Sequence, residues 1–82
     1  MNQYIATFHT HLAALMTCRT LTREGIPAQM APVPRRLSSS CGTCVRYKAE
    51  GPRLEVMDED VESVYLLTED EQYAQVHVNH VR

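Results

Sequence analysis

The sequence predicts an α+β domain of the ferredoxin-like βαββαβ type, in which two helices cover one face of a four-stranded sheet. Short runs rich in β-branched and aromatic residues predict the strands. One stretch with helical periodicity, bounded by a start signal and a stop signal, predicts the first helix. The chain has 82 residues, which suits a single domain over residues 1–82 and leaves no room for a second core.

The first strand and the first helix have the clearest signals. Residues 3–8 are rich in β-branched and aromatic side chains, which is typical of a strand. Thr10 is a suitable N-cap for a helix over residues 11–24, whose apolar side chains gather along one side. Gly25 stands where this helix is expected to end, and Pro27 follows two residues later.

The middle of the chain predicts two strands joined by a loop. Residues 26–31 alternate in polarity and predict the second strand, which Pro32 and Pro34 end. Residues 43–48 also alternate and predict the third strand. Between these strands, residues 35–42 have neither helical nor strand periodicity. An unpatterned loop in so short a chain indicates a functional task.

The last third of the chain permits two interpretations. Apolar residues at helical spacing and an acidic start predict a second helix over residues 58–67. A fourth strand is then expected over residues 72–78. In the competing interpretation, the frequent β-branched and aromatic residues form three strands, over residues 54–57, 63–67 and 73–78.

Charge is distributed unevenly along the chain. Residues 1–53 carry seven basic and two acidic residues, a net of +5, whereas residues 54–82 carry one basic and eight acidic residues, a net of −7. The basic half suits an anionic small group or an acidic protein partner, and the two halves together would suit a homodimer. A pI near 6.0, without a basic run that contains aromatics, argues against nucleic-acid binding.

The chain has no apolar run long enough for a membrane span or for a secretory signal. We therefore expect a cytoplasmic protein that does not bind membranes. Because the cytoplasm is reducing, its three cysteines are expected to be thiols at rest. This environment favours a reactive or metal-binding role for the cysteines over a structural disulfide.

Cys41 is the candidate reactive residue. It follows three serines and precedes Gly42, so its surroundings are small and polar, and backbone amides could form a nest for an anion. Arg36 and Arg35 lie five and six residues earlier. Positive charge and amide donors favour the nucleophilic thiolate form of a cysteine. The alternative is a buried, inert cysteine in a turn.

Four short segments resemble one known family. Their sequences are Phe8-His9-Thr10-His11-x-Ala13-Ala14-Leu15, Gly25-Ile26-Pro27, Pro32-Val33-Pro34-Arg35 and Ser38-Ser39-Ser40-Cys41-Gly42. Together they resemble the small bacterial family of selenium/sulfur carrier-like proteins, whose members occur alone or joined to a TusA-like sulfur-carrier domain. The resemblance covers roughly residues 3–48. Cys44 and the acidic end after residue 54 depart from the family pattern.

The resemblance implies a carrier protein rather than a stand-alone enzyme, and no cofactor is expected. Cys41 would take a sulfur or selenium atom from a donor, for example a cysteine desulfurase, and hold it as a persulfide or selenenylsulfide. An acceptor protein would then receive the atom. Cys44 would resolve the persulfide in one variant of this mechanism, releasing sulfide and leaving an intramolecular disulfide.

The residues around Cys41 have supporting roles in this interpretation. Arg35 corresponds to the arginine of the family, and Arg35 and Arg36 would stabilise the thiolate and the anionic persulfide. Ser39, Ser40 and Gly42 would surround the sulfur atom bound to Cys41.

Two alternatives use Cys41 and Cys44 as a CxxC pair. A small zinc-binding module would take these thiols together with histidines, above all the pair His77-x-x-His80, although these two histidines, three apart on a predicted strand, would point to opposite faces. The histidines available to it are His9, His11, His77 and His80. A thioredoxin-like redox or interaction module would need the pair at a helix N-terminus, whereas here the pair leads into a strand pattern.

Overall fold

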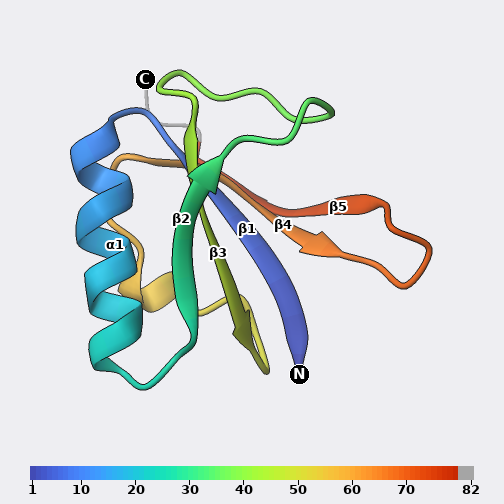
Figure 1. Cartoon of the computed structure of the whole chain (residues 1–82), viewed down its shortest axis with the longest axis horizontal. Coiled ribbons are helices and arrows are strands. Elements are labelled where there is room, and N and C mark those ends of the chain that lie inside the picture. The colour runs from blue at the N-terminus through green and yellow to red at the C-terminus, as the bar shows by residue number, and fades with distance from the viewer. Residues whose placement is uncertain (80–82) are drawn as a thin grey trace.

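The computed structural model describes residues 1–79, which form a five-stranded antiparallel sheet with one α-helix on one face. The strand order is β2-β3-β1-β4-β5, and helix α1 packs against the β1, β2 and β3 part of the sheet (Figure 1). The elements are β1 (Asn2–Phe8), α1 (His11–Arg23), β2 (Ala28–Pro32), β3 (Thr43–Ala49), the 3₁₀-helix η1 (Leu54–Val56), β4 (Val61–Leu67) and β5 (Tyr73–Val78).

Strand β1 is the centre of the sheet and of the core. It pairs with β3 on one side and with β4 on the other, and its residues from Tyr4 to Phe8 are all buried. Every second side chain of β1 faces α1, because side chains alternate along a strand. The large buried side chains under the helix come from β1, α1, β3 and β4, and are Tyr4, Phe8, Leu21, Val45, Tyr47, Val61 and Val64.

Helix α1 has the boundaries that its capping residues predict. The Thr10 hydroxyl accepts a hydrogen bond from the Ala13 amide at 3.0 Å, so Thr10 is confirmed as the N-cap. At the other end, Gly25 has a φ of +82°, the left-handed conformation that commonly follows a helix. Ala14 and Leu21 on the sheet-facing side are fully buried. Local signals therefore define this helix.

The predicted ferredoxin-like plan is wrong. Residues 61–67, which were predicted to belong to a second helix, form strand β4 between β1 and β5. The acidic start of this segment forms a turn instead of a helical first turn, because the Val61 amide donates to the Asp58 carbonyl at 3.0 Å and the Asp60 amide donates to the Asp58 carboxylate at 2.9 Å. The sheet thus has five strands instead of four.

The competing interpretation is correct for two of its three strands. Residues 63–67 and 73–78 lie in β4 and β5, whereas residues 54–56 form the 3₁₀-helix η1. The β2–β3 connection, residues 33–42, projects beyond the ends of its two strands (Figure 1). No helix formed by residues 1–79 is long and apolar enough to cross a lipid bilayer.

Candidate functional site around Cys41

Cys41 lies at the end of the β2–β3 loop, two residues before β3 begins. Its side chain is half-buried against the edge of the hydrophobic core, and its thiol donates to the Thr43 carbonyl at 3.5 Å. The next residue, Gly42, has a φ of +76°, which favours glycine, and its carbonyl accepts from the Val33 amide at 3.2 Å. The thiol is therefore partly accessible while the backbone beside it is fixed.

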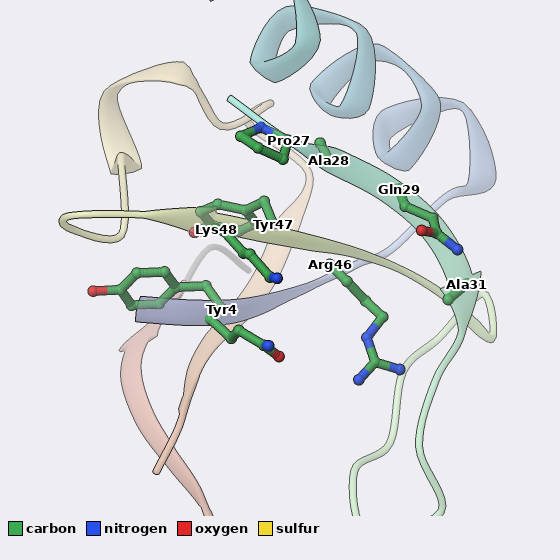
Figure 2. Close-up of a pocket in the computed structure, with 9 residues that line it drawn as sticks. Tyr4, Pro27, Ala28, Gln29, Ala31, Arg46, Tyr47 and Lys48 are labelled. Atoms are coloured by element: carbon green, nitrogen blue, oxygen red, sulfur yellow. The ribbon is translucent and has the colours of Figure 1, made fainter. Parts of the chain in front are cut away.

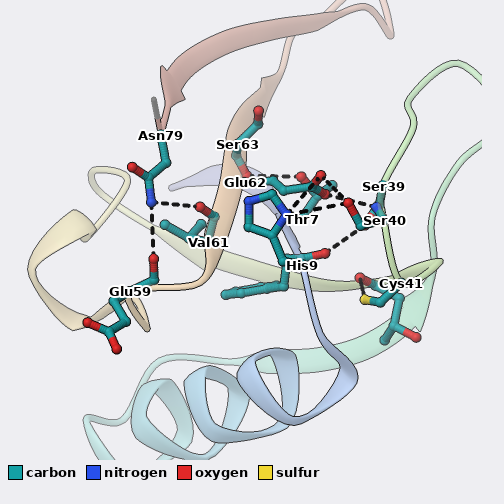
Figure 3. A network of polar contacts seen from close by, with 12 residues as sticks. Thr7, His9, Ser39, Ser40, Cys41, Glu59, Val61, Glu62, Ser63 and Asn79 are labelled. Atoms are coloured by element: carbon teal, nitrogen blue, oxygen red, sulfur yellow. Dashed lines mark hydrogen bonds and ion pairs between the residues drawn. The ribbon is translucent and has the colours of Figure 1, made fainter. Parts of the chain in front are cut away.

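The serine run attaches the segment before Cys41 to two strands. The Ser39 hydroxyl donates to the Phe8 carbonyl, at the end of β1, at 2.9 Å. Ser40 donates twice to the Glu62 carboxylate on β4, from its amide at 3.1 Å and from its hydroxyl at 2.8 Å. Figure 3 shows these contacts beside Cys41. Three hydrogen bonds thus hold the loop where the candidate nucleophile follows.

The junction between β1 and α1 lies against the same loop. His9 Nδ1 is 3.4 Å from the Ser40 hydroxyl and 3.4 Å from a Glu62 carboxylate oxygen. His11 Nδ1 is 3.4 Å from the Thr43 hydroxyl. One histidine therefore contacts the residue before Cys41, and the other contacts a residue just after it. The fold brings together the histidine segment and the serine-cysteine segment that carry the family resemblance.

Glu62 is a part of the site that the sequence did not single out. Burial acts to raise the pKa of its carboxyl, but the hydrogen bonds from the Ser40 hydroxyl and amide and the charge of His9 outweigh burial, so the pKa lies below its ordinary value of 4.5. Glu62 is thus an ionised acceptor at neutral pH. Glu62 lies at a β-bulge, between Val61, which pairs with Phe8, and Ser63, which pairs with Thr7, so strand alternation alone would not have placed it.

Cys44 points to the other face of the sheet. Alternation along β3 places it opposite in direction to Val45, which lies in the core under α1. Its side chain is fully buried, and its thiol donates to the Pro32 carbonyl at 3.6 Å. Burial raises the pKa of the Cys44 thiol, and the nearby Arg46 charge only partly offsets this effect. Both thiols of the CxxC pair are free.

Arg35 and Arg36 line a hollow to which Cys41 does not contribute. This hollow of about 500 Å³ lies on the sheet face opposite α1 and is also lined by Arg46 from β3. The Arg36 guanidinium donates to the Glu71 carbonyl, in the β4–β5 turn, at 3.0 Å. Of the predicted site residues, the structure therefore gathers the two serines and the glycine at Cys41. The two arginines line the hollow on the opposite face, and Cys44 is buried on the side of β3 away from the core.

Within residues 1–79, no three His, Cys, Asp or Glu side chains are grouped so that they could hold a metal ion. Among the predicted zinc ligands, His77 lies on β5 and is paired with Val64 of β4. His9 and His11 lie at the cysteine loop, as described above, and His80 lies outside the described residues.

The model of a protein family described as "Putative Se/S carrier protein-like" matches residues 3–63, about three quarters of the chain. The match spans β1, α1, β2, β3 and the start of β4, so that it includes both Cys41 and Glu62. A search of curated proteins and a search of solved structures each found no significant match.

Proposed function

The chain belongs to the family described as "Putative Se/S carrier protein-like", and from this membership we propose that Cys41 carries a sulfur or selenium atom between two proteins. The atom is held as a persulfide or a selenenylsulfide. The observation that carries the proposal is the setting of Cys41, a half-exposed thiol on a loop that hydrogen bonds hold to β1 and β4. This setting lies within residues 3–63, which match the family model.

The transfer needs no external oxidant or reductant. The Cys41 thiolate attacks the terminal sulfur of a donor persulfide, and a new S–S bond forms while the S–S bond of the donor breaks. The donor cysteine leaves as a thiolate, and Cys41 now bears the terminal sulfur. Attack by a thiolate of the acceptor protein repeats the same exchange and returns Cys41 to its thiolate. With a selenium donor, the terminal atom is selenium.

The contacts of the loop suit this exchange. The serine hydroxyls and the Ser40 amide hold the backbone, whereas the sulfur of Cys41 makes only its own hydrogen bond to the Thr43 carbonyl. Loading the sulfur therefore leaves the hydrogen bonds of the serines in place. His9 and His11, when protonated, would place positive charge near an anionic persulfide and stabilise it.

Cys44 has a structural role in this proposal. Because burial raises its pKa, it remains a thiol at neutral pH and is a poor nucleophile. It also lies on the opposite side of β3 from the core-facing residues. The atom on Cys41 is therefore passed to a partner instead of being released by an internal disulfide.

A cysteine desulfurase suits the donor role, because it presents sulfur as a protein-bound persulfide. The cytoplasm suits the carrier, because its reducing environment keeps the unloaded Cys41 from forming a disulfide.

The test is loading from a purified cysteine desulfurase supplied with cysteine, followed by alkylation, digestion and mass spectrometry. The fragment that contains Cys41 should gain the mass of one alkylated sulfur atom, and Cys41→Ser should abolish this gain. Cys18→Ser and Cys44→Ala are matched controls, because each removes one thiol elsewhere, and both should load like the wild-type protein. Loading of Cys41→Ser at the wild-type level would overturn the proposal.

A further inference from the structure

Three arginines converge on the sheet face that α1 leaves uncovered. Arg35 and Arg36 come from the β2–β3 loop, Arg46 comes from β3, and all three line the hollow of about 500 Å³. We propose that this hollow, called here the arginine hollow, binds the phosphate group of a small organic molecule. The arginine hollow is completed by Pro34, Leu67, Glu71 and Tyr73.

The charge of the arginine hollow is not neutralised by ion pairs within the described chain. Among residues 1–79, the ion pairs of arginine are those of Arg53, with Glu24 and Glu55. The three arginines therefore line one hollow, and none of them has a carboxylate of the described residues within ion-pair distance, although Glu71 also lines it. Like charges held together repel each other, and a bound anion relieves this repulsion. The arrangement thus favours a ligand with more than one negative charge.

Two of the three arginines have defined anchor points. Arg36 extends across to the β4–β5 turn, where its guanidinium donates to the Glu71 carbonyl at 3.0 Å. Arg46 stands on β3, which is paired on both sides, so its backbone is rigid. A guanidinium group presents a planar fork of donors that matches two oxygens of a phosphate. Phosphate is therefore the oxyanion that these groups suit best.

A second hollow shows where the organic part of such a ligand would lie. It has a volume of about 630 Å³, shares Arg46 with the arginine hollow, and is also lined by Lys48 and Gln29. Figure 2 shows Arg46 and Lys48 projecting from β3, with Gln29 on the neighbouring β2. Amide and ammonium groups bind hydroxyl groups well. The two hollows together therefore fit a hydroxylated organic phosphate.

This site does not depend on the carrier function. Arg46 alternates with the core-facing Val45 and Tyr47, so it lies on the face opposite α1, whereas Cys41 packs against the core. Phosphate binding should therefore persist when Cys41 is replaced.

The test is an NMR titration of the whole chain with sodium phosphate and, separately, with glycerol 3-phosphate, at constant ionic strength. Both should give saturable shifts of amides that line the arginine hollow, with the ester binding more tightly. Arg35→Gln and Arg46→Gln should each weaken binding about tenfold, because each removes a charge-assisted donor pair. Arg19→Gln is the matched control, an exposed arginine on α1 with the same charge change, and should bind within about twofold of wild type.

Three results would overturn the proposal. One is a titration that does not saturate with either phosphate compound. Another is an equal weakening by Arg19→Gln and by Arg46→Gln, which would indicate attraction to net charge alone. The third is loss of phosphate binding in Cys41→Ser, which would place the ligand at the cysteine. Unchanged amide shifts outside the hollow verify that each variant is folded.

Discussion

At the scale of single residues, the Glu62 carboxylate holds the serine segment that precedes Cys41 in place. Glu62 accepts hydrogen bonds from the amide and the hydroxyl of Ser40, and one of its oxygens lies 3.4 Å from His9. Each of these contacts needs a hydrogen-bond acceptor, and the ionised Glu62 carboxylate provides it. The position of Cys41 in its loop therefore depends on the negative charge of Glu62 on β4.

Glu62→Gln should destabilise the protein at neutral pH by about 1 kcal/mol, because hydrogen bonds to a charged acceptor are lost. The pKa of Glu62 lies below its ordinary value of 4.5, so its contribution to stability is present above that pH. The contribution is lost as the pH falls through the lower pKa of the folded state. Wild type and variant should therefore converge in stability in acid, as measured by urea unfolding at a series of pH values.

Glu69→Gln is the matched control for this measurement, because Glu69 is an exposed carboxylate in the β4–β5 connection. It should leave the free energy of unfolding at neutral pH nearly unchanged. A difference between Glu62→Gln and wild type that stays constant on acidification would contradict the assigned role of the carboxylate.

At the scale of elements, the first half of the fold could be predicted and the second half could not. The boundaries of α1 follow from Thr10 and Gly25, which act on adjacent backbone and so leave a local signal. Strand β4 has no such signal, because both of its faces are at least partly covered and polar and apolar residues do not alternate cleanly. Its pairing with β1 outweighs the helical spacing of Val61 and Val64.

The same difference explains how much of the candidate site could be predicted. Cys41, its serines and Gly42 are neighbours in sequence, so the composition of the loop indicates them. The contact with Glu62 exists only because β4 pairs with β1, more than fifty residues earlier in the chain. Likewise, the direction of the Cys44 side chain follows from the alternation along β3, which a CxxC spacing does not express.

Thr10→Ala should reduce the free energy of unfolding by about 1 kcal/mol, because the Ala13 amide loses its acceptor at the start of α1. Thr10 also lies between the two histidines at the cysteine loop, so the amide shifts of Ser40 and Thr43 should change. Urea unfolding and an amide NMR spectrum measure the two effects.

Thr22→Ala is the control for the cap, since Thr22 is an exposed threonine within α1 whose hydroxyl donates to the Cys18 carbonyl. Alanine forms helices more readily than threonine, so this variant should be as stable as wild type or slightly more stable. An equal loss in both variants would show that Thr10 does not act as a cap.

At the scale of the whole molecule, the two faces of the sheet have different tasks. The face under α1 forms the core and supports the cysteine loop at its edge. The opposite face carries the arginine hollow and the hollow beside Arg46 and Lys48. One helix is enough to bury a small core. On the opposite face Ile5, Thr7 and Cys44 are also buried, and the part around Arg46 and Lys48 is open to ligands.

The strand order also predicts a gradient of local stability. Native-state hydrogen exchange should be slowest for the amides of β1, which has a paired strand on each side, and similarly slow for β3. It should be fastest, among the strands, for β5, an edge strand in which most residues are exposed. Exchange of β5 amides as slow as that of β1 amides would contradict this order. Amide exchange followed by NMR measures each strand separately.

The central place of β1 has a consequence for synthesis of the chain. This strand is translated before its neighbours, because Gln3 pairs with Lys48 on one side and with Leu67 on the other. At about 5–20 residues per second, β1 waits for several seconds before both neighbouring strands have been translated. During that interval its apolar residues remain without their sheet partners. The sheet can therefore be completed only after the residues of β5, the last strand, have been translated.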